Sequence, residues 1–153
     1  MRASVFATAA ASLVLFAGCS TTQEIMLAKA SPKGTIQTIA RATGDSNSSD
    51  MNKNVEDAFS ALGITVKPTL PVDTRKSSDV DAVVTYSDQW RWDLVMYLRA
   101  LTVNIFDAES GDLLVSGQWH DSAMHGFRDA REVARNLVAD MLGRLKAATT
   151  AQK

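Results

Sequence analysis

Cysteine is almost absent from this sequence, which holds one thiol, Cys19, in 153 residues. A single thiol excludes an internal disulfide framework and any zinc site that needs several cysteines. An excess of either charge is also lacking, because 16 basic and 17 acidic side chains give a formal net charge of -1. The basic residues are scattered and do not alternate with aromatic ones, which excludes a strongly basic nucleic-acid-binding protein.

The first 18 residues differ sharply in composition from the rest. Arg2 is the only charged side chain among them, and residues 3–16 are small or apolar. A short positive segment, followed by an apolar stretch too short to span a bilayer and then by small residues, is typical of a secretory signal. Residues 1–18 are therefore predicted to be an export signal.

Ala17, Gly18 and Cys19 resemble the end of a bacterial lipoprotein signal, although that pattern prefers Leu where this chain has Phe16. The resemblance implies cleavage between Gly18 and Cys19, a diacylglyceryl thioether on Cys19 and an acylated amino group. Three acyl chains would anchor the protein stably to a membrane. Ser20 stands where Asp would retain such a protein in the inner membrane, which implies the outer membrane. The alternative is that Cys19 is a buried free thiol behind an ordinary export signal.

The remaining chain is predicted to hold a tether, one domain and a short tail. Residues 19–33 begin with a polar run and are expected to form a tether after the lipidated cysteine. Residues 34–147 show β-forming segments and two amphipathic helical patterns, which predict a single α+β domain. The resemblance to a lipoprotein signal implies that this domain faces the periplasm. Residues 148–153 are expected to be a frayed tail.

The predicted elements of residues 34–147 follow the order β-α-β-β-β-β-α. One helix is expected over residues 51–62 with Asp50 as its N-cap, and the other from Asp129 onward, where Asp129 and Glu132 fit a capping box. Strands are expected at residues 34–42, 64–66 (stopped by Pro68), 80–87, 96–107 and 113–119. This order predicts a mostly antiparallel sheet of about five strands with both helices packed on one face.

Residues 107–112 are predicted to form the turn between the last two strands. Gly111 suits a residue with positive φ, and the Asp107 carboxylate can accept hydrogen bonds from the amides of the turn. A hairpin here pairs the segments on either side of it and fixes which side chains share a face.

His120 and His125 are the two histidines, and Asp121 lies between them. Two imidazoles and a carboxylate are ligands for a transition metal, so an enzyme or metal-binding protein using these three residues is one hypothesis. Their spacing fits no standard helical or ribbon motif, and solvated loop histidines are the simpler interpretation. With no nucleophile motif in the sequence, we expect no enzyme, no cofactor and no metal.

A second metal pattern is incomplete. Asp45, Asn47, Ser49 and Glu56 fall on ligand positions of a calcium loop, but Asp50 stands where that loop needs glycine. We interpret the segment as a polar loop that leads into the first helix.

Trp90, Arg91 and Trp92 form the most unusual segment of the chain. In a strand the two tryptophans would point to one face and Arg91 to the other. Trp and Arg are favoured in binding surfaces, so these residues are the candidate contact surface for another envelope protein or a cell-wall component. The alternative is that the tryptophans belong to the core or to a cross-strand aromatic cluster.

Residues 82–86, 90–93 and 107–114 carry a resemblance to a family of small Gram-negative lipoproteins of unknown function. The layout is also loosely similar to the peptidoglycan-synthase activator lipoproteins and to the amino-terminal domain of TolB. Those proteins are binding modules, and the family brings no established catalytic residues. The resemblance implies an outer-membrane-anchored periplasmic lipoprotein with a non-catalytic role in binding or envelope maintenance, and with the membrane as one partner through its lipid anchor.

Overall fold

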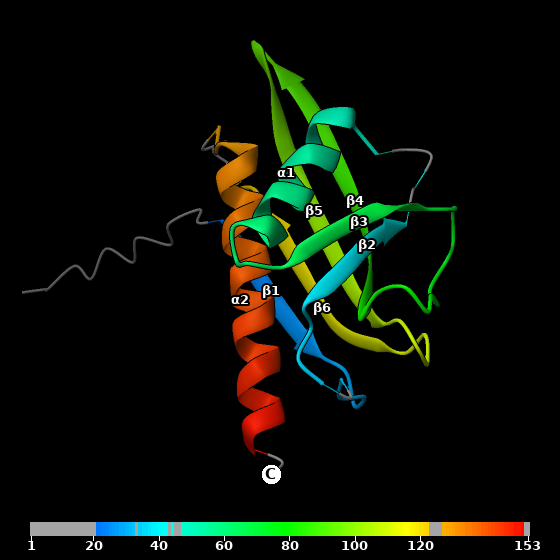
Figure 1. Cartoon of the computed structure of the whole chain (residues 1–153). Coiled ribbons are helices and arrows are strands. Elements are labelled where there is room, and N and C mark those ends of the chain that lie inside the picture. The colour runs from blue at the N-terminus through cyan, green and yellow to red at the C-terminus, as the bar shows by residue number, and fades with distance from the viewer. Residues whose placement is uncertain (1–20, 33, 43, 45–46, 123–126, 152–153) are drawn as a thin grey trace, which may run out of the picture.

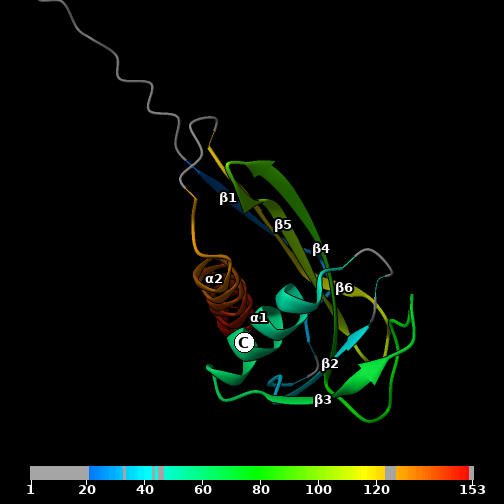
Figure 2. The same ribbon diagram turned by 90° about the horizontal axis from the view of Figure 1, so that it is seen from above.

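Two helices cover one face of a six-stranded sheet in the computed structural model (Figures 1 and 2). The structure describes residues 21–32, 34–42, 44, 47–122 and 127–151. The elements are β1 (Thr22–Leu27), β2 (Thr38–Ala42), α1 (Ser49–Ser60), β3 (Thr65–Leu70), β4 (Ala82–Asp93), β5 (Val95–Asp107), β6 (Leu113–His120) and α2 (Ala130–Ala151). The predicted α+β class is confirmed, with one strand more than expected.

The sheet is mixed, with the strand order β1-β6-β5-β4-β2-β3. The pairings of β6 with β1, of β5 with β6 and of β4 with β5 are antiparallel. By contrast, β2 is parallel to both of its neighbours, β3 and β4. Parallel neighbours need a crossover connection, and α1 supplies the crossover between β2 and β3.

The strand that the sequence did not predict is β1, and it corrects the expected tether over residues 19–33. Thr22 pairs with His120 and Leu27 with Val115, so this segment forms one edge of the sheet. Ile25 is the one residue of β1 that packs against the core cluster, while its neighbours in the strand are exposed. A strand that buries a single apolar side chain leaves no alternating pattern in the sequence.

The opposite edge strand also differs from its prediction. The sequence predicts a strand that begins at Ile64 and is stopped by Pro68, yet β3 runs from Thr65 through Pro68 to Leu70. Proline lacks an N–H, and an edge strand tolerates this where the missing donor faces away from the sheet. The strand before it is shorter than predicted, because β2 begins at Thr38 rather than at Gly34.

Both helices have capped amino-terminal ends. Ser48, rather than the predicted Asp50, caps α1, and its Oγ accepts a hydrogen bond from the N–H of Met51 over 3.3 Å. The predicted cap of α2 is confirmed, since Asp129 Oδ1 accepts hydrogen bonds from the N–H groups of Arg131 and Glu132. The helix continues to Ala151, so most of the predicted tail over residues 148–153 is helical. Among the described residues, no helix is long and apolar enough to cross a membrane.

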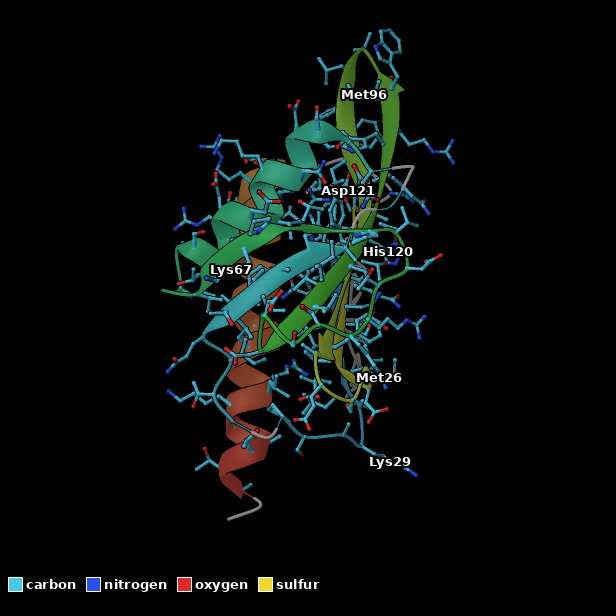
Figure 3. All side chains as sticks on the ribbon, turned by 45° about the vertical axis from the view of Figure 1, so that its right-hand side comes forward. Met26, Lys29, Lys67, Met96, His120 and Asp121 are labelled. Atoms are coloured by element: carbon cyan, nitrogen blue, oxygen red, sulfur yellow. The ribbon has the colours of Figure 1, made fainter. Side chains whose placement is uncertain are left out.

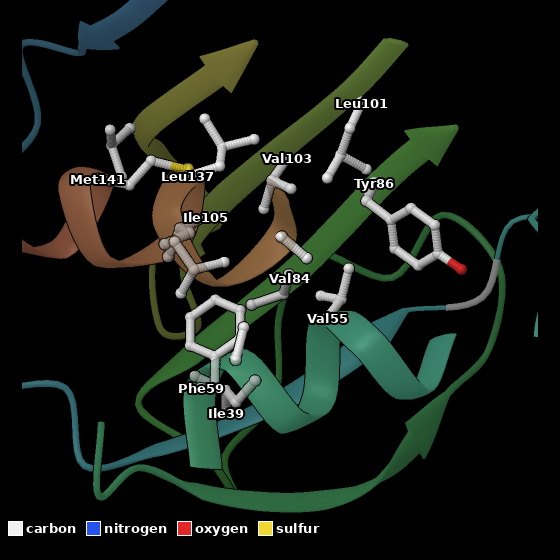
Figure 4. Packing of buried hydrophobic residues seen from close by; sticks show 14 of the residues in the cluster. Ile39, Val55, Phe59, Val84, Tyr86, Leu101, Val103, Ile105, Leu137 and Met141 are labelled. Atoms are coloured by element: carbon white, nitrogen blue, oxygen red, sulfur yellow. The ribbon is translucent and has the colours of Figure 1, made fainter. Parts of the chain in front are cut away.

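The main core lies between the helices and the sheet. Figure 4 shows Val55 and Phe59 of α1 and Leu137 of α2 pointing toward the side chains of the central strands. The two helices also contact each other. Gly117 of β6 lies under α2, where a Cβ atom would be 2.5 Å from Sδ of Met141. The absence of a side chain at this position therefore lets the helix approach the sheet closely.

The predicted hairpin turn between β5 and β6 is confirmed. Gly111 has a φ of 79°, and Asp107 Oδ1 accepts hydrogen bonds from the N–H groups of Glu109 and Ser110. Ile105 pairs with Val115 across the two strands. This turn lies at the end of the sheet where β4 begins, because Ala82 pairs with Asp107.

Candidate functional site

The β4–β5 hairpin projects beyond the rest of the sheet (Figure 1). The last pairing between β5 and β6 joins Ala100 to His120. Beyond that level β4 and β5 continue to pair with each other, through Trp92 with Met96 and finally Asp93 with Val95. We call residues 91–96 the hairpin tip.

Four large apolar side chains of the hairpin tip are exposed. Their exposed fractions are 70% for Trp92, 84% for Leu94, 52% for Val95 and 60% for Met96. Figure 3 shows Met96 on the part of the hairpin that projects beyond the rest of the sheet. An exposed apolar side chain is ordinary on its own, but four of them on one projecting element make the hairpin tip a candidate interaction site.

The turn of this hairpin is made by a residue in an unfavourable conformation. Leu94 separates the two strands and has a φ of 63°. Left-handed backbone is common for Gly and Asn and uncommon for a bulky aliphatic residue, whose Cβ crowds the carbonyl oxygen. Leu94, the most exposed large apolar side chain among the described residues, therefore stands where the local conformation favours a different residue type.

A β-bulge separates the hairpin tip from the rest of the sheet. Gln89 pairs with Ala100, but the next residue, Trp90, pairs with Leu98, so Arg99 has no opposite partner in β4. Arg99 Nη1 donates hydrogen bonds to the carbonyl oxygens of Asp121 and Ser122. The extra residue turns Leu98 onto the core face, against which Trp90 also packs.

The base of the hairpin is tied to α1 by polar contacts. Asp88 Oδ2 accepts a hydrogen bond of 2.7 Å from Ser48 Oγ and another from Trp90 Nε1. Two residues earlier, the Tyr86 hydroxyl donates to Asn52 Oδ1 over 2.6 Å. Burial, together with the nearby Asp88 carboxylate, raises the pKa of Tyr86 above its usual range, which keeps this hydroxyl protonated as a donor. The helix N-cap thus fixes the direction of the hairpin.

The two tryptophans predicted to act together are separated by the structure. Trp90 is half-buried against the core, whereas Trp92 is exposed at the hairpin tip with Arg91 beside it. Sequence reasoning found Trp92 but missed Leu94, Val95 and Met96. The available signal was the apolar run of residues 94–96, which begins at the turn position, Leu94, where Gly, Pro or Asn is usual.

An aromatic contact lies next to the hairpin tip. The rings of Tyr97 and Phe127 meet edge to face, with their centroids 5.5 Å apart. Tyr97 is buried, whereas Phe127 is about half exposed and precedes the start of α2. Exposed apolar surface therefore also occurs beside the hairpin, at the amino-terminal end of α2.

The hypothetical metal or catalytic group is not assembled among the described residues. His120 is exposed at the end of β6, while Asp121 is buried and accepts a hydrogen bond from the N–H of Ser122 (Figure 3). His125 lies outside the described residues. Within the part of the chain that the structure describes, no group of three or more His, Cys, Asp or Glu side chains is arranged to hold a metal.

The calcium-like pattern is equally dispersed. Asp45 lies outside the described residues, and Glu56 forms a 2.9 Å ion pair with Arg41 Nε. Arg41 is buried and also donates to Thr69 Oγ1, so Glu56 balances a buried positive charge. Its carboxylate therefore has a structural role in holding α1 to β2 and β3.

A cavity of about 530 Å³ lies at the opposite end of the molecule from the hairpin tip. Two of its carboxylates, Asp81 and Asp107, are used to bind backbone. Asp81 Oδ2 accepts hydrogen bonds of 2.9 and 2.8 Å from the N–H groups of Gln37 and Thr38. The Gln37 contact is the largest cause that lowers the pKa of Asp81, with partial burial opposing it and Thr38 adding to it. These carboxylates hold loops in place.

Comparison with known proteins identifies the fold. No protein-family model and no curated protein sequence matches this chain. The dodecamer of PelC from Paraburkholderia phytofirmans has a TM-score of 0.56 at 15% identity, over 82% of this chain and 96% of that one. A variant of the same protein gives 0.53 at 17% identity over the same shares. A minor lipoprotein from Acinetobacter baumannii gives a weaker likeness of 0.33 at 13% identity, over 77% and 90%. The PelC likeness shows a shared fold.

Proposed function

We propose that this chain is a lipoprotein of the outer membrane, anchored through Cys19, whose domain faces the periplasm and acts as a non-catalytic binding module. Its contact surface is the hairpin tip with Trp92, Leu94, Val95 and Met96. The observation that carries the proposal is that these side chains are more than half exposed on an element that projects from the sheet. The signal-like residues 1–18 and the small residue before Cys19 support the anchor.

The energetics favour a covered hairpin tip over one that stays in water. Burying a large apolar side chain contributes about 1.5–3 kcal/mol relative to leaving it exposed. Only part of that free energy appears as affinity, because ordering and desolvation oppose association. Interaction sites are also enriched in Trp and Arg, and Trp92 and Arg91 are adjacent here. The tip is therefore the described surface best suited to bind another component of the envelope.

Site-specific photo-crosslinking in intact cells tests this assignment. A benzophenone amino acid at position 92 is expected to form a defined product, identified by mass. The matched control is position 118, where Gln118 is exposed on β6 away from the hairpin tip. A product from position 92 and none from position 118 supports the binding surface. No product at position 92, or equal products at both positions, would contradict it.

A further inference from the structure

We infer that the hairpin tip inserts into the same membrane surface that holds the lipidated Cys19, so that the bilayer itself is the component it contacts. This inference rests on the proposed lipid anchor. It gives the domain a second membrane contact and a fixed orientation. The carrying observations are the position of the tip relative to the start of β1, its side chains and the backbone of Leu94.

The start of β1 and the hairpin tip lie at the same end of the sheet. Thr22, the first residue of β1, pairs with His120, and His120 pairs on its other side with Ala100 of β5. Since β1 and β5 are both antiparallel to β6, they run in the same direction. The first residue of β1 therefore lies at the end of the sheet from which the β4–β5 hairpin projects (Figure 1).

The two lengths match a shallow insertion. Val95 lies five residues before Ala100, which places the tip about 17 Å beyond the level of Thr22 at the usual rise of a strand. Cys19 lies three residues before Thr22, and three extended residues reach at most about 11 Å. With the thioether of Cys19 at the membrane surface, the tip therefore reaches at least about 6 Å deeper than that thioether. Amphipathic elements that lie in the interface insert their apolar groups about 5–10 Å.

The side chains of the tip suit the interface of a bilayer. Trp92 and Met96 are directly opposite each other, so their side chains share one face of the hairpin. Tryptophan is enriched at the headgroup level, where its ring is amphipathic. Exposed Arg91 can keep its guanidinium among lipid phosphates while its stem lies along apolar surface. Asp93, opposite Val95, carries a charge that restricts the tip to a shallow depth.

The backbone conformation of Leu94 indicates that leucine is present at this position for a contact with a partner and not for the stability of the domain. Its side chain is mostly exposed, and its φ of 63° is one that Asn adopts at lower cost. Neither packing nor backbone geometry in the described structure favours leucine at this turn. A lipid environment favours leucine at this turn, because it removes the apolar side chain of Leu94 from water. Strain of this kind at an exposed position is typical of functional sites.

Fluorescence quenching in vesicles tests the inference on the lipidated protein. The protein is extracted from its envelope and reconstituted into vesicles of phosphatidylethanolamine and phosphatidylglycerol with brominated acyl chains. We expect bromine to quench Trp92 emission in the native protein. Trp92→Phe removes the reporter while leaving an apolar ring, and retains Trp90 and Trp119, so its emission is expected to be insensitive to brominated lipid. Equal quenching of the two proteins would overturn the inference.

A second pair of variants separates insertion from folding. Leu94→Asn is expected to reduce the quenching of Trp92 by at least half without lowering the thermal midpoint, since Asn tolerates this backbone conformation. Leu62→Asn, at an exposed leucine after the end of α1, is expected to leave quenching unchanged. Unchanged quenching in Leu94→Asn, or an equal decrease in both variants, would overturn the inference.

The outcomes distinguish this inference from the proposed anchor. Intact mass reports whether Cys19 carries lipid, independently of quenching. A lipidated protein whose Trp92 is not quenched retains the anchor and overturns insertion of the tip. A photo-crosslink from position 92 to a protein, in place of lipid, likewise overturns insertion and leaves the binding module. A protein that carries no lipid at Cys19 overturns both proposals.

Discussion

Thr22 and Ala100 lie at the same level of the sheet, because each pairs with His120 from opposite sides. This relationship places the start of β1 and the projecting β4–β5 hairpin at one end of the domain, while the Gly111 turn lies at the other. It depends on β1 being a strand of the sheet. If residues 22–27 formed a free tether, the position of Cys19 would carry no information about the orientation of the domain.

The contact between α2 and the sheet is tested by a pair of α2 residues. Leu137 is fully buried, so Leu137→Ala is expected to lower the free energy of unfolding by about 2–5 kcal/mol. Arg135 is exposed on the same helix, and Arg135→Ala is expected to cost less than about 0.5 kcal/mol. Denaturant midpoints of the two variants measure the difference. Equal losses would mean that α2 does not present this face to the sheet.

Two glycines near α2 have opposite expected responses to alanine. At Gly117 a Cβ would contact Sδ and Cγ of Met141 at 2.5 and 2.8 Å, so Gly117→Ala is expected to destabilise by about 1–3 kcal/mol. At Gly143, inside α2, a Cβ meets no atom within 4 Å, so Gly143→Ala is expected to stabilise by about 0.5–1 kcal/mol. Thermal unfolding followed by circular dichroism measures whether the melting temperature falls in Gly117→Ala and rises in Gly143→Ala. A stable Gly117→Ala protein would contradict the close approach of α2 to β6.

Asp88 is expected to hold the hairpin against α1. Asp88→Ala removes the acceptor of the Ser48 hydroxyl and of the Trp90 indole, and is expected to cost about 1–3 kcal/mol. Asp93→Ala, at the exposed hairpin tip, is the matched control and is expected to change stability by less than about 0.5 kcal/mol. Denaturant unfolding compares the two. A neutral Asp88→Ala would show that other contacts fix the direction of the hairpin.

Asp81 is expected to make the free energy of unfolding depend on pH in the acid range. The pKa of Asp81 is lowered from its ordinary value in the folded protein, chiefly by the hydrogen bond from the Gln37 N–H, so folding favours the ionised form of Asp81. The contribution is present above the unfolded value and is lost as the pH falls through the lower folded pKa. Asp81→Asn should therefore lose less stability on acidification than the native protein does. Denaturant midpoints between about pH 6 and about pH 2.5 test this, and identical acid profiles would contradict it.

The parts of the fold that sequence reasoning predicted are those with repeated or local signals. The apolar face of α2, the Asp129 cap and the Gly111 turn each have a pattern that depends on near neighbours in the chain, and each is confirmed. The N-cap of α1 is Ser48 and not the predicted Asp50. Both residues are good caps, and the contact of Ser48 with Asp88, forty positions away, decides between them.

The parts that were missed depend on tertiary contacts. In β1 only Ile25 packs against the core, so polar residues 22–24 gave no sign that they pair with β6. Pro68 indicated the end of a strand, but at the edge of the sheet its missing N–H leaves no neighbouring strand without a hydrogen-bond donor. Between the hairpin tip and the rest of the sheet, the bulge at Arg99 changes which face each side chain occupies, and no local sequence pattern predicts this bulge. Leu94 breaks the rules for turn residues, which is why the turn was not predicted.

The intact mass of the protein extracted from its native envelope tests the central claim most directly, because both the anchor and the orientation of the hairpin tip depend on Cys19. We expect a chain that begins at Cys19 and carries a diacylglyceryl thioether and an acylated amino group. Cys19→Ser should carry neither, because serine cannot form the thioether. A native chain with a free Cys19 thiol, or one that begins at another residue without lipid, would contradict the account.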